Sequence, residues 1–388
     1  MRRASRCAAV EKILYLGPIC GKICYRDFIM KNGEGMMTTK YIKWTPEGGF
    51  DAGELSQAVR TIREGGLVAF PTETVYGLGG NGLRPEASRK IYAAKGRPSD
   101  NPLILHIAEK EQLRRIARGV PEKAEKLAQV FWPGPLTMIF EKAAVVPYET
   151  TGGLDTVAVR MPGHRGALEF LKEAGVPVAA PSANTSGRPS PTRAAHVRED
   201  LDGFIDMVID GGDVGIGYES TILDMTERVP VILRPGAITK QMLADVIGEV
   251  VMDPALMSAG SGRPKAPGMK YRHYAPNAEM IVFRGEMEAV ADRIRKQVQS
   301  YVREGRYQAD EIGILAAEET AGSYAEGQVV SAGSRRDGTV GNTLYGALRK
   351  FDELHVKMIL SESFYELEQQ EAIMNRLLKA AGQRTIDV

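Results

Sequence analysis

Apolar and polar positions after residue 40 alternate between helical and strand spacing. Apolar residues recur at intervals of three and four from Leu55 to Ile62, which predicts an amphipathic helix over 55–63. Gly65 and Gly66 end this pattern, and the apolar run that follows predicts a buried strand over 67–70. The same patterns predict helices over 85–94, within 111–130 and over 167–174, and strands over 103–107, 156–160, 176–180, 207–209, 221–223 and 231–233.

The strands are numerous for the helices between them. This favours an α/β fold with a twisted mixed sheet and flanking helices over a doubly wound parallel sheet. Residues 258–268 are rich in Gly, Pro and Ser, as is typical of a linker. After it we expect strands over 280–283, 312–315, 329–330 and 356–360, and helices over 287–303, 344–353 and 365–380. The predicted segments are an extension (1–35), a first domain (36–252), a linker (253–278) and a smaller α/β domain (279–388).

Composition describes a globular protein. Hydrophobic residues make up 43% of the 388 residues, and 50 basic residues face 49 acidic ones, for a net charge of +1. That balance argues against a protein that coats nucleic acid, although it leaves a local basic groove open. No apolar run reaches the roughly 18 residues of a membrane-spanning helix, so we expect no membrane segment and a cytoplasmic protein.

The first 35 residues differ from the rest. They carry seven basic and three acidic residues, and they hold all three cysteines, Cys7, Cys20 and Cys24. A disulfide framework or a zinc site in the main body is therefore excluded. The stretch before Met36 and Met37 would be encoded by purine-rich codons, as in a ribosome-binding site read in frame. We expect translation to begin at Met36 or Met37, which intact-mass measurement of the native protein would test.

Polar clusters follow the ends of several predicted strands, where α/β folds place ligand sites. Residues 71–77 (PTETVYG) carry hydroxyls and a carboxylate, and residues 181–190 (PSANTSGRPS) are dense in small donors suited to phosphate or ribose. Gly96 and Pro98 end the helix that precedes them, so Lys95 and Arg97 project from an irregular loop, and their charges suit a polyphosphate. Taken singly, residues 71–77 are better explained as a capped strand end, and the other two clusters are also explained by solvated surface loops.

Other chemistry is disfavoured. The serine-rich loop lacks the Gly-x-Ser-x-Gly spacing of a hydrolase nucleophile. The five histidines are too scattered for a metal motif, so we expect no metal site built by the chain. His106 lies inside an apolar run, where the residues alone predict a core histidine.

The clusters in this order resemble one family. The matching runs are PTETVYGLGGNG (71–82), KGRP (95–98) with Asn101–Leu103, WPGPLT (132–137), DTVAVRMP (155–162), PSAN (181–184), STI (220–222) and RPG (234–236). The chain is similar to the Sua5/YrdC/YwlC family of threonylcarbamoyl-AMP synthases over about residues 50–250. The run APGMKYRHYAP (266–276) and the domain after it resemble the longer, two-domain Sua5 type. The resemblance implies a YrdC-like catalytic domain, a linker over the active site, and a smaller Rossmann-like Sua5 domain.

The resemblance implies a nucleotidyltransferase. It would join L-threonine, bicarbonate and ATP, with Mg²⁺, and release pyrophosphate and threonylcarbamoyl-AMP. That product supplies the N6-threonylcarbamoyladenosine modification at tRNA position 37, through a downstream threonylcarbamoyl transferase machinery. The chemistry needs positioning and charge neutralisation more than a covalent nucleophile, which agrees with a chain that offers no reactive Cys in its body and no P-loop.

Site residues follow from the matching motifs. The resemblance assigns triphosphate neutralisation to Lys95 and Arg97. It assigns the rest of the nucleotide site to Asn101, Thr156, Ser182, Asn184, Ser190, Arg234, Tyr271 and His273. It assigns L-threonine binding to Thr74, His106, Arg160 and Ser220, with Arg160 pairing with the threonine carboxylate. For His106 the resemblance replaces the core interpretation.

Two other functions fit the same fold. The first is a double-stranded RNA-binding or ribosome-maturation factor, and direct binding of double-stranded RNA or tRNA stays open. The second is a carbamoyl-transfer maturation domain, which the absence of cysteine from the body disfavours, because that type carries zinc fingers. Detection of the adenylate by mass spectrometry, with and without bicarbonate, would separate these from the synthase.

Overall fold

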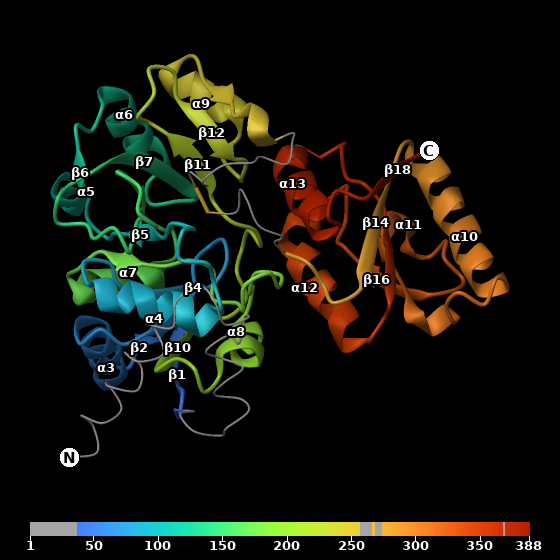
Figure 1. The fold of residues 1–388 in the computed structure, drawn as a ribbon, viewed down its shortest axis with the longest axis horizontal. Coiled ribbons are helices and arrows are strands. Elements are labelled where there is room, and N and C mark those ends of the chain that lie inside the picture. Colours follow the sequence, from blue (N-terminus) through green and yellow to red (C-terminus); the bar gives the residue numbers. More distant parts are fainter. Residues whose placement is uncertain (1–36, 257–265, 268–273, 368) are drawn as a thin grey trace, which may run out of the picture.

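The larger of two sheets mixes parallel and antiparallel strands, which confirms the predicted twisted mixed sheet (Figure 1). The computed structural model describes residues 37–256, 266–267, 274–367 and 369–388, so the predicted extension and Met36 lie outside the described residues. Across this sheet the strands are β13 (Val251–Met252), β12 (Val231–Arg234), β11 (Thr221–Asp224), β7 (Leu136–Lys142), β8 (Thr156–Arg160), β5 (Ile104–His106), β9 (Val178–Ala179), β4 (Gly77–Asn81), β3 (Val68–Phe70), β10 (Met207–Asp210), β1 (Lys40–Thr45) and β2 (Gly49–Phe50), and β6 (Ala117–Arg118) pairs with β7. We call residues 37–256 the large unit.

Helices flank this sheet and begin and end where the sequence gives local signals. Asp51 caps the first of them by accepting hydrogen bonds from the backbone N–H groups of Gly53 and Glu54. The next begins at Pro85 and ends at Gly96, whose φ of 62° suits a glycine. The helices of the large unit are α3 (Ala52–Arg63), α4 (Pro85–Lys95), α5 (Lys110–Ile116), α6 (Glu122–Phe131), α7 (Arg165–Ala174), α8 (Ala194–Leu201) and α9 (Lys240–Ile247), and a short 3₁₀ turn, η1, spans Pro254–Leu256.

The smaller sheet is parallel throughout and has five strands, in the order β16-β15-β17-β14-β18. We call residues 274–388 the small unit. Its strands are β14 (Glu279–Arg284), β15 (Ile312–Ala316), β16 (Gln328–Ser331), β17 (Met358–Ser361) and β18 (Thr385–Asp387). Its helices are α10 (Met287–Arg303), α11 (Glu318–Ala321), α12 (Val340–Glu353) and α13 (Gln370–Ala380), with a 3₁₀ turn η2 at Ala309–Glu311.

Several predicted elements differ from the structure in extent. The helical stretch within 111–130 is two helices, α5 and α6, because Gly119 takes a left-handed φ of 58° and Pro121 follows it. The closing helix begins at Gln370 rather than Tyr365. The sequence pattern also missed β4, whose residues are mostly glycine. A Cβ at Gly79 would lie 2.9 Å from Val178 Cγ1, so close packing inside the sheet requires glycine there.

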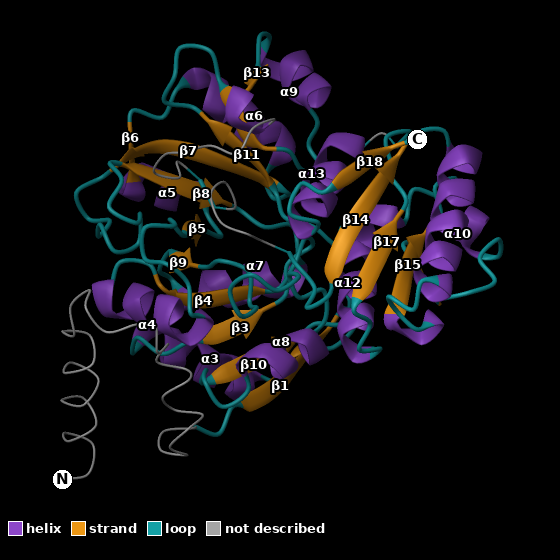
Figure 2. Ribbon diagram, turned by 45° about the vertical axis from the view of Figure 1, so that its right-hand side comes forward, coloured by secondary structure: helices purple, strands orange, loops and turns teal. Residues whose placement is uncertain are grey.

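Helices α12 and α13 lie on the face of the small sheet that is turned toward the large unit, and α10 covers the opposite face (Figures 1 and 2). The contact between the units is close. A Cβ at Gly217 would lie 2.5 Å from the Cα of Asn342, and a Cβ at Gly341 would lie 2.5 Å from the ring of Tyr218. The side-chain amide of Asn342 also donates to the backbone oxygen of Gly215 at 2.5 Å. The units therefore meet at backbone contact distance.

In the part of the chain that the structure describes, no helix combines the length and apolar character needed to cross a bilayer.

Candidate functional site

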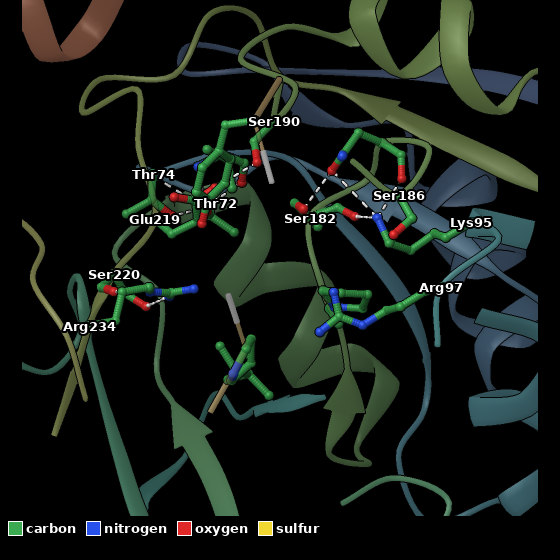
Figure 3. A pocket seen from close by; sticks show the side chains of 18 of the residues that line it. Thr72, Thr74, Lys95, Arg97, Ser182, Ser186, Ser190, Glu219, Ser220 and Arg234 are labelled. Atoms are coloured by element: carbon green, nitrogen blue, oxygen red, sulfur yellow. Dashed lines mark hydrogen bonds between the residues drawn. The ribbon is translucent and has the colours of Figure 1, made fainter. Parts of the chain in front are cut away.

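A cavity opens in the large unit where several loops converge. The loops follow β3, β9 and α4, and further residues come from the starts and ends of β8, β11 and β12 (Figure 3). Pro267 and Tyr274, which flank a part of the predicted linker that lies outside the described residues, also line it, and the neighbouring Ala266 is buried. The cavity thus lies where the sequence places the ligand loops and beside the linker.

Lys95 is held in the cavity wall by backbone oxygens. Its ammonium donates to the carbonyl of Ser182 at 2.5 Å and to the carbonyl of Asn184 (Figure 3). The side chain is only 1% exposed. Burial first, and then the charge of Arg97, lower the pKa of Lys95 well below its usual range. An arriving polyanion would favour the charged form again, so Lys95 suits a phosphate site.

Arg97 and Arg234 bring two more cations to the cavity. Arg97 donates through Nε to the Asn101 carbonyl at 3.3 Å and through Nη2 to the Pro102 carbonyl at 3.2 Å. Arg234 donates through Nε to the Ser220 carbonyl at 3.0 Å and through Nη2 to Ser220 Oγ at 3.2 Å. Burial lowers the pKa of Arg97 to about 10 and also lowers that of Arg234. Both guanidinium groups stay charged at neutral pH and are fixed by backbone acceptors.

Arg160 and Thr74 form a second polar group in the same cavity. Arg160 Nη1 donates to Thr74 Oγ1 at 2.9 Å, Nε donates to the Gly134 carbonyl at 3.2 Å, and Nη2 lies 2.7 Å from Glu73 Oε1. Thr72 Oγ1 lies 2.8 Å from Thr74 Oγ1. A buried guanidinium beside hydroxyls can bind a carboxylate in a bidentate manner.

His106 lies in the cavity wall as an uncharged ring. Its Nδ1 lies 3.2 Å from the Ile104 carbonyl, and its ring meets Phe70 edge to face. Burial first, and then the charge of Arg160, lower the pKa of His106 to about 3. At neutral pH His106 can therefore exchange hydrogen bonds with a substrate but contributes no charge.

Glu219 is the only carboxylate among the described residues that line the cavity, and it is neutralised by its neighbours. Ser190 Oγ donates to Glu219 Oε1 at 2.6 Å, the Tyr345 hydroxyl donates to Oε2 at 2.9 Å, and Arg376 Nε donates to Oε2 at 3.1 Å. Burial alone would raise the pKa of Glu219, but the charges of Arg376 and Arg234 and the hydrogen bond from Ser190 hold it at about 2. Tyr345 and Arg376 belong to the small unit.

Most of the predicted site residues meet at this cavity. Those that line it are Lys95, Arg97, Ser182, Asn184, Ser190, Arg234, Thr74, His106, Arg160 and Ser220. Asn101 is buried beside it, and its backbone oxygen holds Arg97. Thr156 begins β8 opposite Glu141, at the other end of the strand from Arg160, and does not line the cavity. Tyr271 and His273 lie outside the described residues.

The sequence missed other lining residues, among them Thr72, Arg188, Glu219 and Tyr274. Glu219 directly precedes the predicted site residue Ser220, which was a usable signal. Its partners in the small unit, Tyr345 and Arg376, lie more than 120 positions further along the chain. Among the described lining residues, five are cationic (Lys95, Arg97, Arg160, Arg188 and Arg234) and one is acidic. Two of these cations are already ion-paired, Arg160 with Glu73 and Arg188 with Asp200, and Lys95, Arg97 and Arg234 supply the positive charge that an anionic ligand would meet.

No group of three or more His, Cys, Asp or Glu among the described residues could hold a metal ion. A magnesium ion can nevertheless bind largely through substrate phosphates and water, and it needs few protein ligands when it does so. The excess of cations in the cavity fits a metal carried by a polyphosphate better than one held by the chain.

Comparisons with known proteins cover nearly the whole described chain. A family model described as "Telomere recombination" matches residues 60–236, and one described as "Threonylcarbamoyl-AMP synthase, C-terminal domain" matches residues 238–382. A threonylcarbamoyl-AMP synthase of Bacillus subtilis is 50% identical over 335 residues, which are 86% of this chain and 94% of the relative. One of Pyrococcus abyssi is 49% identical over 327 residues, which are 84% and 94%.

A solved structure agrees with these sequence matches. The crystal structure of P. abyssi Sua5 complexed with L-threonine superimposes with a TM-score of 0.84 and 46% sequence identity. The match covers 90% of this chain and all of that one.

Proposed function

The chain belongs to the Sua5/YrdC/YwlC family of threonylcarbamoyl-AMP synthases, and we propose that it joins L-threonine, bicarbonate and ATP to form threonylcarbamoyl-AMP and pyrophosphate. The observation that carries this proposal is the cavity itself. Its described lining places phosphate-type cations, Lys95 and Arg97, in one space with a carboxylate-type group, Arg160 and Thr74. A cavity with five cations and one neutralised carboxylate supports binding of a triphosphate and an amino acid together.

The reaction has two bond-forming steps. The uncharged amine of threonine adds to bicarbonate with loss of water and becomes a carbamate. A carbamate oxygen then attacks the α-phosphorus of ATP, and the bond to the β-phosphate breaks, which releases pyrophosphate. Neither step needs a covalent link to the protein, so the residues act by positioning and by charge.

Lys95, Arg97 and Arg234 bear the charge on the nucleotide side. Lys95 and Arg97 neutralise the triphosphate, and Arg234, which lies beside Ser220 across the cavity from Lys95 and Arg97, adds a further cation (Figure 3). Magnesium bound to the phosphates would supply further charge neutralisation for the leaving pyrophosphate. Burial lowers the pKa of Lys95 in the free protein, and a bound polyanion would favour its charged form.

Arg160, Thr74, His106 and Ser220 hold threonine. Arg160 binds the carboxylate of threonine. Glu73 Oε1 lies 2.7 Å from Arg160 Nη2 in the free protein, so Glu73 has to move away from this nitrogen when threonine binds. His106 is uncharged, so it offers threonine a hydrogen bond and leaves the carboxylate to Arg160. Ser220 bridges the two halves, because its Oγ bonds to Arg234 and lies 2.7 Å from Thr137 Oγ1.

The product would be passed to a threonylcarbamoyl transferase that modifies adenosine 37 of tRNA in the cytoplasm.

Direct binding of double-stranded RNA or tRNA finds little support in the cavity. Lys95, Arg97, Arg160 and Arg234 are buried or nearly so, and side chains in a cavity cannot reach the phosphate backbone of a duplex. Filter binding with labelled tRNA tests that alternative.

The proposed function is tested by incubating the protein with L-threonine, bicarbonate, ATP and Mg²⁺. We expect pyrophosphate release and a threonylcarbamoyl-adenylate mass, both lost when threonine or bicarbonate is left out. Pyrophosphate release that needs neither co-substrate would contradict the proposal. Omission of Mg²⁺ tests the metal separately.

A further inference from the structure

Arg376 of α13 belongs to the small unit, but its guanidinium bonds mainly to the large unit. Its exposed fraction is 0%. Nε donates to Glu219 Oε2 at 3.1 Å, Nη2 donates to the Glu219 backbone oxygen at 3.1 Å, and Nη1 donates to the Pro235 backbone oxygen. One planar side chain thus joins the segment before β11 to the segment after β12.

Those two segments carry residues that line the cavity. Glu219 precedes Ser220, and Pro235 follows Arg234. Ser220 and Arg234 are hydrogen-bonded to each other at 3.0 and 3.2 Å, and the ladder between β11 and β12 shifts register next to them. A register shift weakens the strand pairing at this point. Arg376 bonds to both of these segments from the side of the small unit, at the point where the strand pairing is weakened.

The Glu219 carboxylate extends this hold to the serine-rich loop. It accepts from Ser190 Oγ on the cavity side and from the Tyr345 hydroxyl and Arg376 on the side of the small unit. Tyr345 also stacks on Tyr274, which lines the cavity, with ring centroids 5.2 Å apart. A buried carboxylate that accepts hydrogen bonds from both sides has one favourable position.

A second arginine of the small unit holds the same loop at another point. Arg349 of α12 is 1% exposed and donates through Nη2 to the Pro189 carbonyl at 2.7 Å and to Asp200 Oδ2 at 2.8 Å. Pro189 precedes Ser190. The small unit therefore contacts the backbone beside Ser190, Ser220 and Arg234, and touches those three cavity residues through their neighbours.

On the basis of the proposed function, we propose that Arg376 and Tyr345 of the small unit are positioning residues for the synthase reaction, which act through Glu219 to fix Ser190, Ser220 and Arg234 for threonine and nucleotide. Arg376 and Tyr345, which do not line the cavity, then complete the active site without touching substrate. Arg97 is held by the carbonyls of Asn101 and Pro102 in another segment of the large unit, which this contact does not touch.

Two variants and a matched control test the proposal. Arg376→Lys keeps the charge but cannot bond three acceptors in one plane, and Tyr345→Phe removes one hydroxyl without changing ring packing. The control is Arg335→Lys, because Arg335 bonds to a buried carboxylate, Glu362, and to a backbone oxygen, that of Ser363, within the small unit. The measurements are KM for L-threonine and for ATP, kcat for pyrophosphate release, L-threonine affinity by calorimetry, and thermal unfolding.

We expect Arg376→Lys to raise both KM values and weaken threonine binding by about tenfold or more. Tyr345→Phe should shift them in the same direction by a smaller factor, and Arg335→Lys should leave them at the wild-type values. Wild-type KM values and threonine affinity in the folded variants would overturn the inference. If Arg376→Lys does not fold, the KM values and threonine affinity of Tyr345→Phe decide the question. Absence of threonine-dependent activity in the wild-type protein would instead contradict the proposed function.

Discussion

At the scale of single residues, the cavity depends on cations that are buried and held by neutral backbone oxygens. Lys95 and Arg97 accept this arrangement at a cost in their own solvation, which lowers the pKa of both. A polyphosphate restores favourable interactions for them. Their burial therefore prepares a binding site rather than stabilising the fold.

Replacing either cation should remove activity and preserve the fold. We expect Lys95→Ala and Arg97→Ala to lower threonine- and bicarbonate-dependent pyrophosphate release by about 100-fold or more, because each removes charge from the triphosphate. Lys90→Ala is the matched control, since Lys90 lies on the same helix but donates to the Gly65 carbonyl. Turnover at the wild-type rate in either cavity variant would refute the triphosphate role.

The Glu219–Arg376 pair should make part of the stability depend on acid pH. The folded pKa of Glu219 is about 2, below its ordinary 4.5, so its stabilisation is complete above pH 4.5 and is lost as pH falls toward 2. Glu219→Gln should lower the free energy of unfolding by about 3–5 kcal/mol at pH 7, because Arg376 loses its buried partner. The difference from wild type should shrink between pH 4.5 and 2.

Urea unfolding at pH 7 and at pH 3 measures this difference. The control is Glu249→Gln, which changes an exposed carboxylate outside the cavity. An equal gap between wild type and Glu219→Gln at both pH values would show that the carboxylate is not held as an anion by these partners.

The residue scale also shows what the sequence could predict of the site. Lys95 lies at the end of a helix and Ser182 follows a strand, so position in the pattern was enough to select them as candidates, whereas the family resemblance assigned Arg160. His106 sits in an apolar run like a core residue, and only the family resemblance assigned it to the site, whose cavity it lines. The role of Glu219 was missed because Tyr345 and Arg376 reach it from another unit, which no local pattern reports.

At the scale of elements, local signals predicted many of the helices but missed α8 and α9, and they also missed the glycine-rich strand β4. Asp51 and Pro85 announce α3 and α4, since caps act within one turn. Strand β4 carries glycines because neighbouring strands and helices approach it closely, and this need arises only from tertiary packing. Strand propensity depends on such neighbours, so the pattern gave no strand there.

The contact between the loop before Tyr218 and α12 gives a prediction at this scale. Gly217→Ala should destabilise the protein by about 1–3 kcal/mol more than Gly212→Ala. Both glycines have positive φ, 89° and 81°, but a Cβ at Gly217 would meet Asn342 at 2.5 Å, whereas nothing lies within 4 Å of one at Gly212. Urea unfolding of both variants isolates the contact from the backbone strain, and equal losses would contradict close packing between the units.

At the scale of the whole molecule, the near-zero net charge hides a separation of charge. The first 35 residues hold an excess of four positive charges and the remainder an excess of three negative ones, yet the cavity lining carries five cations against one carboxylate. The mixed sheet and the second α/β unit were predictable from periodicity. How the units meet was not, because the buried arginines of α12 and α13 resemble surface charges of amphipathic helices until their partners are known.

The most direct test of the account is the identity of the product. The full chain, incubated with L-threonine, ¹³C-bicarbonate, ATP and Mg²⁺, should yield an adenylate whose mass contains threonine, AMP and one labelled carbon, together with pyrophosphate. Release of pyrophosphate without a labelled adenylate, or no dependence on bicarbonate, would contradict the assignment of the cavity to threonylcarbamoyl-AMP synthesis.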